Sequence, residues 1–192
     1  MLSEHSKIAL GYKLAVAGRR PIAGDAWRVL QTRDFDDDGL VNWRLVATVS
    51  DDDRKLKACQ THPGDLLFAP RSPRLGAVLL GNDVANPRTA ASSHFYIIRV
   101  DRDRLLPEYL VWYLNHPRTQ DKLQAENRGT HLPFIPMDVI RRLDIALPSI
   151  ERQRAIGSIE QLARHERHLA AELVRLHDEQ RAAVMWRAAH SD

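Results

Sequence analysis

The stretch 149-SIERQRAIGSIEQLARHERHLAAELVRLHDEQRAAVMWRAAH-190 determines the architecture of this chain. It contains no proline, and Gly157 is its one glycine. Ser149 is a good helix N-cap, and Glu151 places a carboxylate in the first turn, where the helix dipole favours negative charge. The sequence therefore predicts one continuous helix over residues 149–190, with a length of about 60 Å.

Apolar residues recur along this helix at alternating spacings of three and four. This narrow stripe is typical of the seam of a coiled coil, and the polar residues Glu166 and Gln180 within it are suited to fix register and partner. A single helix leaves such a seam in water, so we expect the helix to pair with another one. The expected pairing residues are Ile159, Leu162, Leu169, Leu173, Leu176 and Ala183.

The part of the chain that precedes this helix reads as short strands separated by turn residues. Glycine, proline and aspartate occur at the ends of the apolar runs, and they are the residues that turns prefer. This pattern favours a mixed, mainly antiparallel sheet over a repeating strand–helix–strand unit. We therefore predict an α+β protein with a domain over residues 1–148 and a long helix over residues 149–192. The expected strands cover residues 27–31, 46–49, 66–69, 75–80 and 94–100.

A helical period replaces the strand pattern after residue 106. Pro107 suits the first turn of a helix over residues 107–114, which Pro117 ends or kinks, and residues 120–125 are expected to continue it. Tyr109, Trp112 and Tyr113 share one face of this helix, so we expect them to pack in the core and not to form a platform for unpaired bases. Residues 137–143 are expected to form one or two helical turns, and residues 144–147 a short strand.

Composition places the chain among ordinary globular proteins. Of its 192 residues, 44% are apolar, and the formal net charge is +3. Residues 151–192 contain seven basic and seven acidic residues, so the excess of positive charge lies in residues 1–150. The absence of a secretory signal and of an apolar run of roughly 18 residues predicts a soluble cytoplasmic protein without a membrane span. Cys59 is the single cysteine, which excludes a disulfide framework and a thiolate metal cage.

Two acidic clusters, at residues 36–38 and 51–53, interrupt the basic character of the first 150 residues. They would repel phosphate, so they must point away from any nucleic acid that the chain binds. The remainder of this region is clearly basic, which is compatible with nucleic-acid binding without requiring it. Neither cluster has the pattern of a cation-binding loop, so we expect solvated turns at both.

Four segments of the chain, in order, resemble the DNA specificity subunits of type I restriction–modification systems. The segment 64-GDLLFAPR-71 is similar to a glycine–aspartate motif of that family, in which two hydrophobic residues and a later arginine follow. The other three segments resemble a strand, the helix that follows it, and the exit from the recognition domain into the long helix. Their residues are 94–100; Pro107, Glu108, Tyr109, Leu110, Leu114 and Asn115; and Gly129, Thr130, Ile135, Leu143, Ile145, Leu147, Pro148, Gln153 and Ile156.

The resemblance implies a DNA target-recognition domain that reads one half of a split site in double-stranded DNA. It also implies that the long helix packs antiparallel against a second such helix and sets the distance between the two half-sites. The implied partners are the adenine methyltransferase subunit and, with it, the endonuclease subunit. Specificity subunits usually contain two recognition domains and two helices, whereas this chain has one of each, so we hypothesise a homodimer that reads an inverted repeat.

Candidate DNA-binding residues lie in loops between the predicted strands and after the predicted helices. Arg71 and Arg74 flank a turn from which a guanidinium can grip the O6 and N7 atoms of guanine. The polar loop over residues 81–93 offers a mixture of donors and acceptors, and the loop near residue 130 belongs to the family pattern. The complete set is Arg71, Arg74, Asn82, Arg88, Ser92, Arg128, Thr130 and His131.

The sequence contains no recognisable set of catalytic residues. The glycine-rich loop and the Asn/Asp-Pro-Pro-aromatic motif of an amino-methyltransferase are missing, and so is the carboxylate and lysine cluster of a nuclease. The histidines at 165, 168 and 177 do not share a face at the spacing of metal ligands. We therefore expect no catalytic residue, no metal and no cofactor. The alternative function is a coiled-coil adaptor or anti-restriction decoy that binds the methyltransferase subunit but not DNA.

Overall fold

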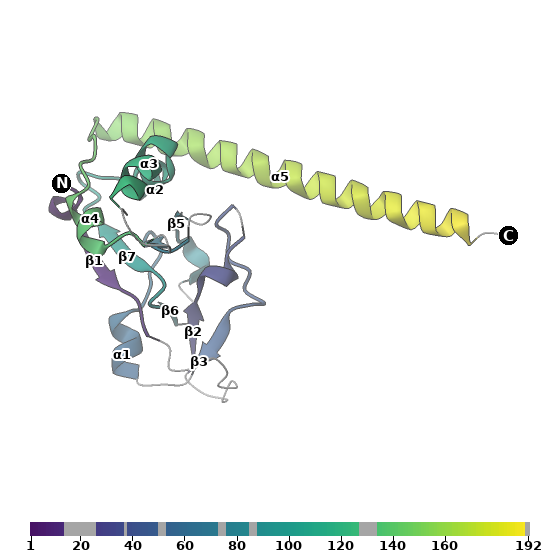
Figure 1. Cartoon of the computed structure of the whole chain (residues 1–192), viewed down its shortest axis with the longest axis horizontal. Helices are drawn as coiled ribbons and strands as arrows, with labels where there is room; N and C mark the ends of the chain where they lie inside the picture. The colour runs from purple at the N-terminus through teal and green to yellow at the C-terminus, as the bar shows by residue number, and fades with distance from the viewer. Residues whose placement is uncertain are drawn as a thin grey trace.

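The computed structural model describes residues 1–13, 26–36, 38–49, 53–72, 76–84, 88–126 and 134–190. A head with two small β-sheets carries one long helix, which runs along the head and then extends beyond it (Figure 1). All strand pairs but one are antiparallel. The predicted α+β class with mainly antiparallel pairing is therefore confirmed, although the strands form two sheets and not one.

The larger sheet forms the centre of the head and has the strand order β1-β7-β4-β5. Successive side chains of a strand point to opposite faces of a sheet, and both faces are buried at β4 and in the first half of β7. Leu66 and Ile98 pack with the helices on one face, whereas Leu67 and Ile97 pack toward the second sheet on the other. The strands are β1 (Ser6–Leu10), β4 (Leu66–Phe68), β5 (Ala77–Leu79) and β7 (Tyr96–Val100).

The smaller sheet lies on the side of the head away from the long helix (Figure 1). Its central strand β2 (Trp27–Leu30) pairs antiparallel with β3 (Ala47–Val49) and parallel with β6 (Thr89–Ala91). Helix α1 (Asp53–Ala58) covers this sheet with Leu56, which is fully buried against Trp27 and Val29.

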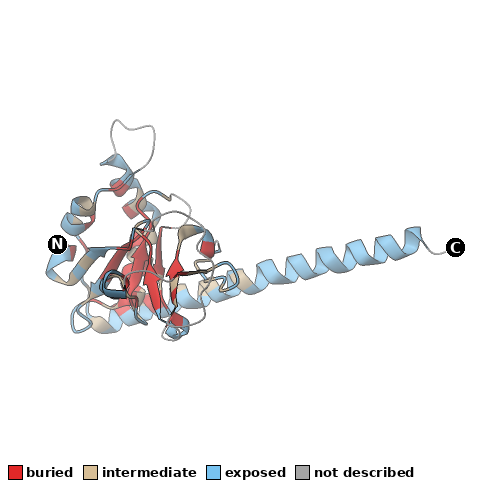
Figure 2. Ribbon diagram, turned by 90° about the horizontal axis from the view of Figure 1, so that it is seen from below, coloured by how far each residue is buried: buried red, intermediate tan, exposed pale blue. Residues whose placement is uncertain are grey.

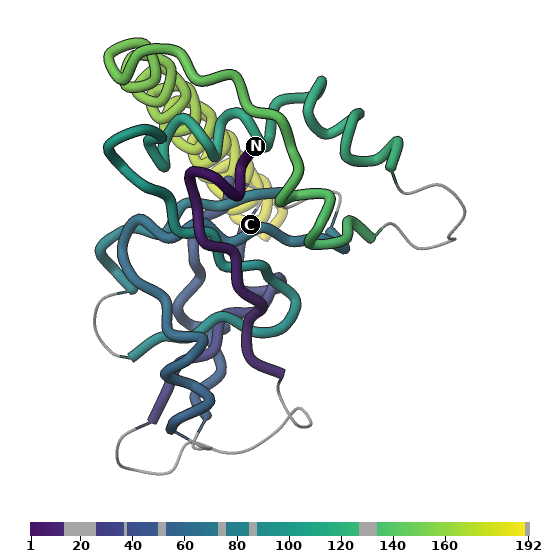
Figure 3. Tube along the Cα trace, turned by 90° about the vertical axis from the view of Figure 1, so that its left-hand side faces the viewer, coloured from purple at the N-terminus to yellow at the C-terminus, as the bar shows by residue number. Residues whose placement is uncertain are grey.

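Helices cover the outer face of the larger sheet. Their order along the chain is clear in Figure 3, where the helix after β7 lies next to the root of the long helix. They are α2 (Pro107–Asn115), α3 (Pro117–Ala125), α4 (Met137–Arg142) and α5 (Ile150–Ala189). Short 3-10 helices η1 (Leu2–Glu4), η2 (Thr32–Asp34) and η3 (Asn82–Val84) complete the described elements.

The long helix has the predicted extent, and the aromatic residues of α2 have the predicted place. The Ser149 side chain accepts a hydrogen bond from the backbone N–H of Arg152, as an N-cap should. Tyr109 is buried in the core, and its ring lies 5.4 Å from that of Trp112 and 6.0 Å from that of Tyr113. The interpretation as a core residue is therefore confirmed for Tyr109, whereas Trp112 and Tyr113 are half-buried and pack against the core.

Two sequence predictions about local structure are wrong. Residues 144–147 do not form a strand, because side chains and not another strand bind their carbonyl groups: the hydroxyl of Tyr109 donates to Ala146 O at 2.7 Å and that of Tyr113 to Asp144 O at 3.1 Å. The region 81–93 is not only loop, because it includes η3 and the buried strand β6. This strand was not predicted because it begins with the polar residue Thr89, which is nevertheless buried.

Candidate nucleic-acid interface and pairing helix

Arg71 lies in the turn that follows β4, and its side chain is exposed. Its guanidinium carbon lies 4.9 Å from the centre of the Phe134 ring. The backbone N–H of Ile135 donates to Pro70 O at 2.9 Å, and the hydroxyl of Tyr96 donates to Ile135 O at 3.0 Å. The Arg71 turn is thus joined to the segment that contains Phe134 and Ile135, at one end of the larger sheet.

The electrostatics of this junction keep Tyr96 a neutral donor. Burial raises the pKa of the Tyr96 hydroxyl, and the positive charge of Arg71 opposes that rise without reversing it. The proton therefore remains on the hydroxyl near neutral pH, where it fixes the Ile135 carbonyl. Arg71 is exposed, and its guanidinium offers the fork of donors that contact with a phosphate or a guanine edge requires.

An asparagine of α2 holds the strand that leaves the Arg71 turn. The side-chain oxygen of Asn115 accepts from Ala77 N at 2.8 Å, and its amide nitrogen donates to Ala77 O at 2.7 Å. The amide therefore pairs with β5 as a neighbouring strand would. Gly76, next to this contact, has a φ of 56°, and a β-carbon there would lie 2.4 Å from the Asn115 side-chain oxygen.

Replacement of Gly76 by alanine is expected to destabilise the head by about 1–3 kcal/mol, since it combines a left-handed backbone with a steric clash. A thermal unfolding experiment measures this as a lower Tm. Gly81→Ala is the matched control, because Gly81 has no left-handed φ and its nearest neighbour is the side chain of exposed Asp83 at 3.0 Å. Equal melting temperatures for the two variants would contradict a tight contact between Gly76 and the Asn115 side chain.

The other described candidates do not join Arg71. Asn82 is exposed in η3 and lines a groove beside α5. Arg88 lies beside the smaller sheet, where its guanidinium is 3.3 Å from the Asp53 carboxylate. Hydrogen bonds from Lys57 and then from Trp27 lower the pKa of Asp53, so this carboxylate stays ionised and holds Arg88.

Ser92 is buried, and its hydroxyl lies 3.3 Å from Nδ1 of His94, so it does not face a duplex in this structure. Arg74, Arg128, Thr130 and His131 lie outside the described residues.

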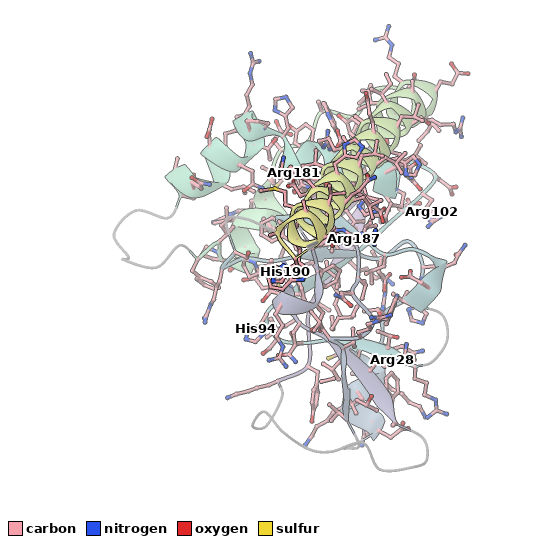
Figure 4. The ribbon with its side chains drawn as sticks, turned by 90° about the vertical axis from the view of Figure 1, so that its right-hand side faces the viewer. Arg28, His94, Arg102, Arg181, Arg187 and His190 are labelled. Atoms are coloured by element: carbon pink, nitrogen blue, oxygen red, sulfur yellow. The ribbon has the colours of Figure 1, made fainter. Side chains whose placement is uncertain are left out.

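Arg28 is a candidate that the sequence analysis missed. It lies on β2, and its guanidinium carbon is 5.2 Å from the centre of the Trp43 ring. The alternation of strand residues could have identified it, because this alternation places Arg28 on the face opposite buried Trp27 and Val29. In Figure 4 the labelled Arg28 and His94 lie on different sides of the lower part of the head.

The root of α5 is fixed to the head by Gln153 and Gly157, both of which are buried. The Gln153 side chain accepts from Leu106 N at 2.9 Å and donates to Arg104 O at 2.9 Å and to Pro148 O at 3.0 Å. A β-carbon on Gly157 would lie 2.7 Å from Cβ of Glu108, so α5 crosses α2 at close range. These contacts set the direction in which α5 leaves the head.

The predicted seam lies on the side of α5 that faces away from the head. At about 100° per residue, Ile159 points about 160° away from Gly157. Ile159 is 68% exposed and Leu162 is 70% exposed, although both belong to the part of α5 that runs along the head. Figure 2 shows the exposed length of the helix beyond the head. Further along the same seam, Leu169, Leu173, Leu176 and Ala183 are exposed as well.

The described part of the chain offers neither a membrane span nor a metal site. No described helix combines the length and the apolar character needed to cross a lipid bilayer. Within the same residues, no group of three or more histidine, cysteine, aspartate or glutamate side chains is arranged to hold a metal ion.

Comparison with known proteins identifies the fold through solved structures. No family model and no curated protein matches the sequence. A chain from a structure described as the basis of complex assembly and conformational transition of the type I R-M system matches with a TM-score of 0.60 and 19% identity, over 96% of this chain and 41% of that chain. The HsdS subunit from Thermoanaerobacter tengcongensis matches with a TM-score of 0.58 and 16% identity, over 90% of this chain and 38% of that chain. This chain thus spans less than half the length of either structure, and its fold is that of a type I restriction–modification specificity subunit.

Proposed function

We propose that this chain recognises one half-site of double-stranded DNA as the specificity component of a type I restriction–modification complex. The head reads the half-site, and α5 pairs antiparallel with the α5 of a second copy, so that the dimer reads an inverted repeat. The adenine methyltransferase subunit, and with it the endonuclease subunit, are the partners in a cytoplasmic complex. The chain itself contributes recognition and no catalytic step.

The observation that carries this proposal is the position of the seam. One face of α5 is occupied by the head at Gly157, while the opposite face presents large apolar side chains to water. Full burial of a leucine or isoleucine side chain is worth about 1.5–3 kcal/mol, so this face favours association with another helix. Antiparallel pairing places the two heads at opposite ends of the rod, which is the arrangement that a split DNA site requires.

Selection of DNA from a random library tests the proposal. The purified chain, alone and with an adenine methyltransferase subunit of a type I system, is expected to enrich duplexes that contain an inverted repeat with a fixed gap. Sedimentation of the same sample is expected to give a dimer. Methyltransferase binding without sequence selection would favour the adaptor or decoy, and a concentration-independent monomer would contradict pairing.

Replacement of Arg71 by alanine is expected to weaken binding to the selected duplex by about 1–3 kcal/mol and to relax the preference at one base pair, as loss of a bidentate guanine contact does. Titration by fluorescence anisotropy at fixed salt measures both effects. Arg44→Ala removes an exposed arginine from a different loop and serves as the control. If the two variants bind alike, Arg71 is not a reading residue.

A further inference from the structure

Helix α5 touches the head at two separate places. The first is the root, where Gly157 crosses α2. The second lies eleven residues later, where His168 meets the head turn that follows η2: Nδ1 of His168 is 3.6 Å from Oδ2 of Asp38. Eleven helical residues span about 16 Å. Two contacts at this separation fix the direction of a helix better than one contact does.

The turn that carries Asp38 is closed by its own hydrogen bonds. The Asp36 carboxylate accepts from Asp38 N at 3.0 Å and from Leu40 N at 2.8 Å, and the backbone N–H of Asp36 donates to Leu40 O at 3.0 Å. Phe35 and Val41 then pair across the base of the turn. These bonds of the Asp36 carboxylate and backbone support the position of Asp38.

The His168 side chain lies between two carboxylates from different elements. Besides Asp38 on the head, Glu172 on α5 approaches it, with its Oε2 atom 3.9 Å from Nε2 of the imidazole. Arg164, one turn earlier on α5, also faces the turn, because its Nη1 atom lies 3.8 Å from the position that a β-carbon on Gly39 would take. The His168 imidazole is thus placed between the turn and the helix, within 4 Å of a carboxylate on each.

Between its two contacts with the head, α5 passes over a groove of 740 Å³. Glu160, Gln161 and His165 line the groove from the helix, and Leu79, Val111 and Arg102 line it from the head. Figure 4 labels Arg102 close to the helix. Along this stretch α5 therefore borders the groove, and His168 at its far end touches the head again.

We propose that Asp38, supported by the hydrogen bonds of Asp36 and Leu40, acts as a strut for α5 and that His168 is the positioning residue that rests on it. The part of α5 beyond His168 extends for about 31 Å, so a rotation about Gly157 moves the tip about three times as far as it moves His168. The strut therefore sets the direction of the rod. Under the proposed function, it sets the separation and the angle of the two heads on DNA.

The test measures the direction of α5 within one chain, independently of DNA and of pairing. Spin labels on cysteines introduced at Ser3 and Ala188, in a Cys59→Ser and Leu173→Arg background, report the distance from the head to the tip. His168→Ala and Asp38→Ala are each expected to shift the mean distance by at least 5 Å or to double the width of the distribution. The double variant is expected to match the single ones, and His168→Lys is expected to restore the original distribution.

His177→Ala is the control, because it removes an exposed histidine from the free part of the same helix. An unchanged distribution in both single variants overturns the strut, and additive shifts in the double variant overturn the pairing of Asp38 with His168. Failure of the proposed function appears elsewhere, as a missing inverted repeat in the DNA selection, and leaves these intramolecular distances unaffected.

Discussion

Replacement of Leu173 by arginine is expected to abolish self-association of this chain. Leu173 is 57% exposed and lies near the middle of the α5 seam, so pairing of two helices brings two copies of this side chain into one small apolar region. The variant removes two buried leucines from the dimer and introduces two charges there. We expect the dimer to weaken at least 100-fold, which corresponds to about 3 kcal/mol, as measured by sedimentation equilibrium.

The neighbouring residue supplies a matched control for this experiment. Val174 is 62% exposed, but one residue along a helix turns the side chain by about 100°, so it lies outside the seam. Val174→Arg introduces the same charge at the same depth along the helix and is expected to leave the dimer intact. Similar losses in the two variants would show that the seam is not the interface.

The second large effect is expected in the stability of the chain when Gln153 is replaced by leucine. The substitution keeps most of the side-chain volume but leaves Leu106 N, Arg104 O and Pro148 O without the bonds that the amide makes. Each buried polar group without a partner costs about 1–3 kcal/mol, and part of that cost is relieved by water at the root of α5. We expect a loss of about 2–5 kcal/mol in the free energy of unfolding, measured in urea.

Gln161→Leu is the comparison for this variant. Gln161 lies on the same helix two turns later, where its side chain is exposed at the groove. Its replacement is expected to change the unfolding free energy by less than 0.5 kcal/mol, as surface substitutions usually do. If Gln153→Leu proves no more harmful than Gln161→Leu, the three hydrogen bonds do not anchor the helix.

The elements that the sequence predicted well are those whose signal is local and periodic. Helix α5 has an N-cap, forty residues without proline, and a regular stripe, all of which can be read without knowledge of the rest of the chain. Strands β4 and β7 are dense in apolar residues because both of their faces are buried. The same reasoning located α2, where Pro107 occupies the first turn.

The elements that the sequence analysis missed depend on distant partners. Strand β1 has exposed residues among its five positions, and its identity comes from pairing with β7, about ninety residues away in the chain. Strand β6 is a three-residue segment that the parallel pairing with β2 defines. Residues 144–147 were predicted as a strand but do not form one. The hydroxyl groups of Tyr109 and Tyr113 donate to the carbonyl groups that a neighbouring strand would otherwise bind.

The candidate interface was predictable only in part for the same reason. The loop sequence predicts that Arg71 is exposed to a ligand. It does not predict that Phe134 lies against Arg71, because that contact joins segments more than sixty residues apart. Asn82 and Arg88 were grouped in one loop by sequence, whereas the structure directs one toward α5 and the other toward α1. Proximity in the sequence does not place two side chains on one surface.

The opposite placement of the two faces of α5 has a consequence for how binding specificity can change. The residues by which the helix touches its head, Gln153, Gly157 and His168, are separate from those of the seam, so a different head could precede residue 149 without any change in the seam side chains. Under the proposed function, chains that keep this seam and differ in their heads would form mixed pairs. Such pairs would read asymmetric sites.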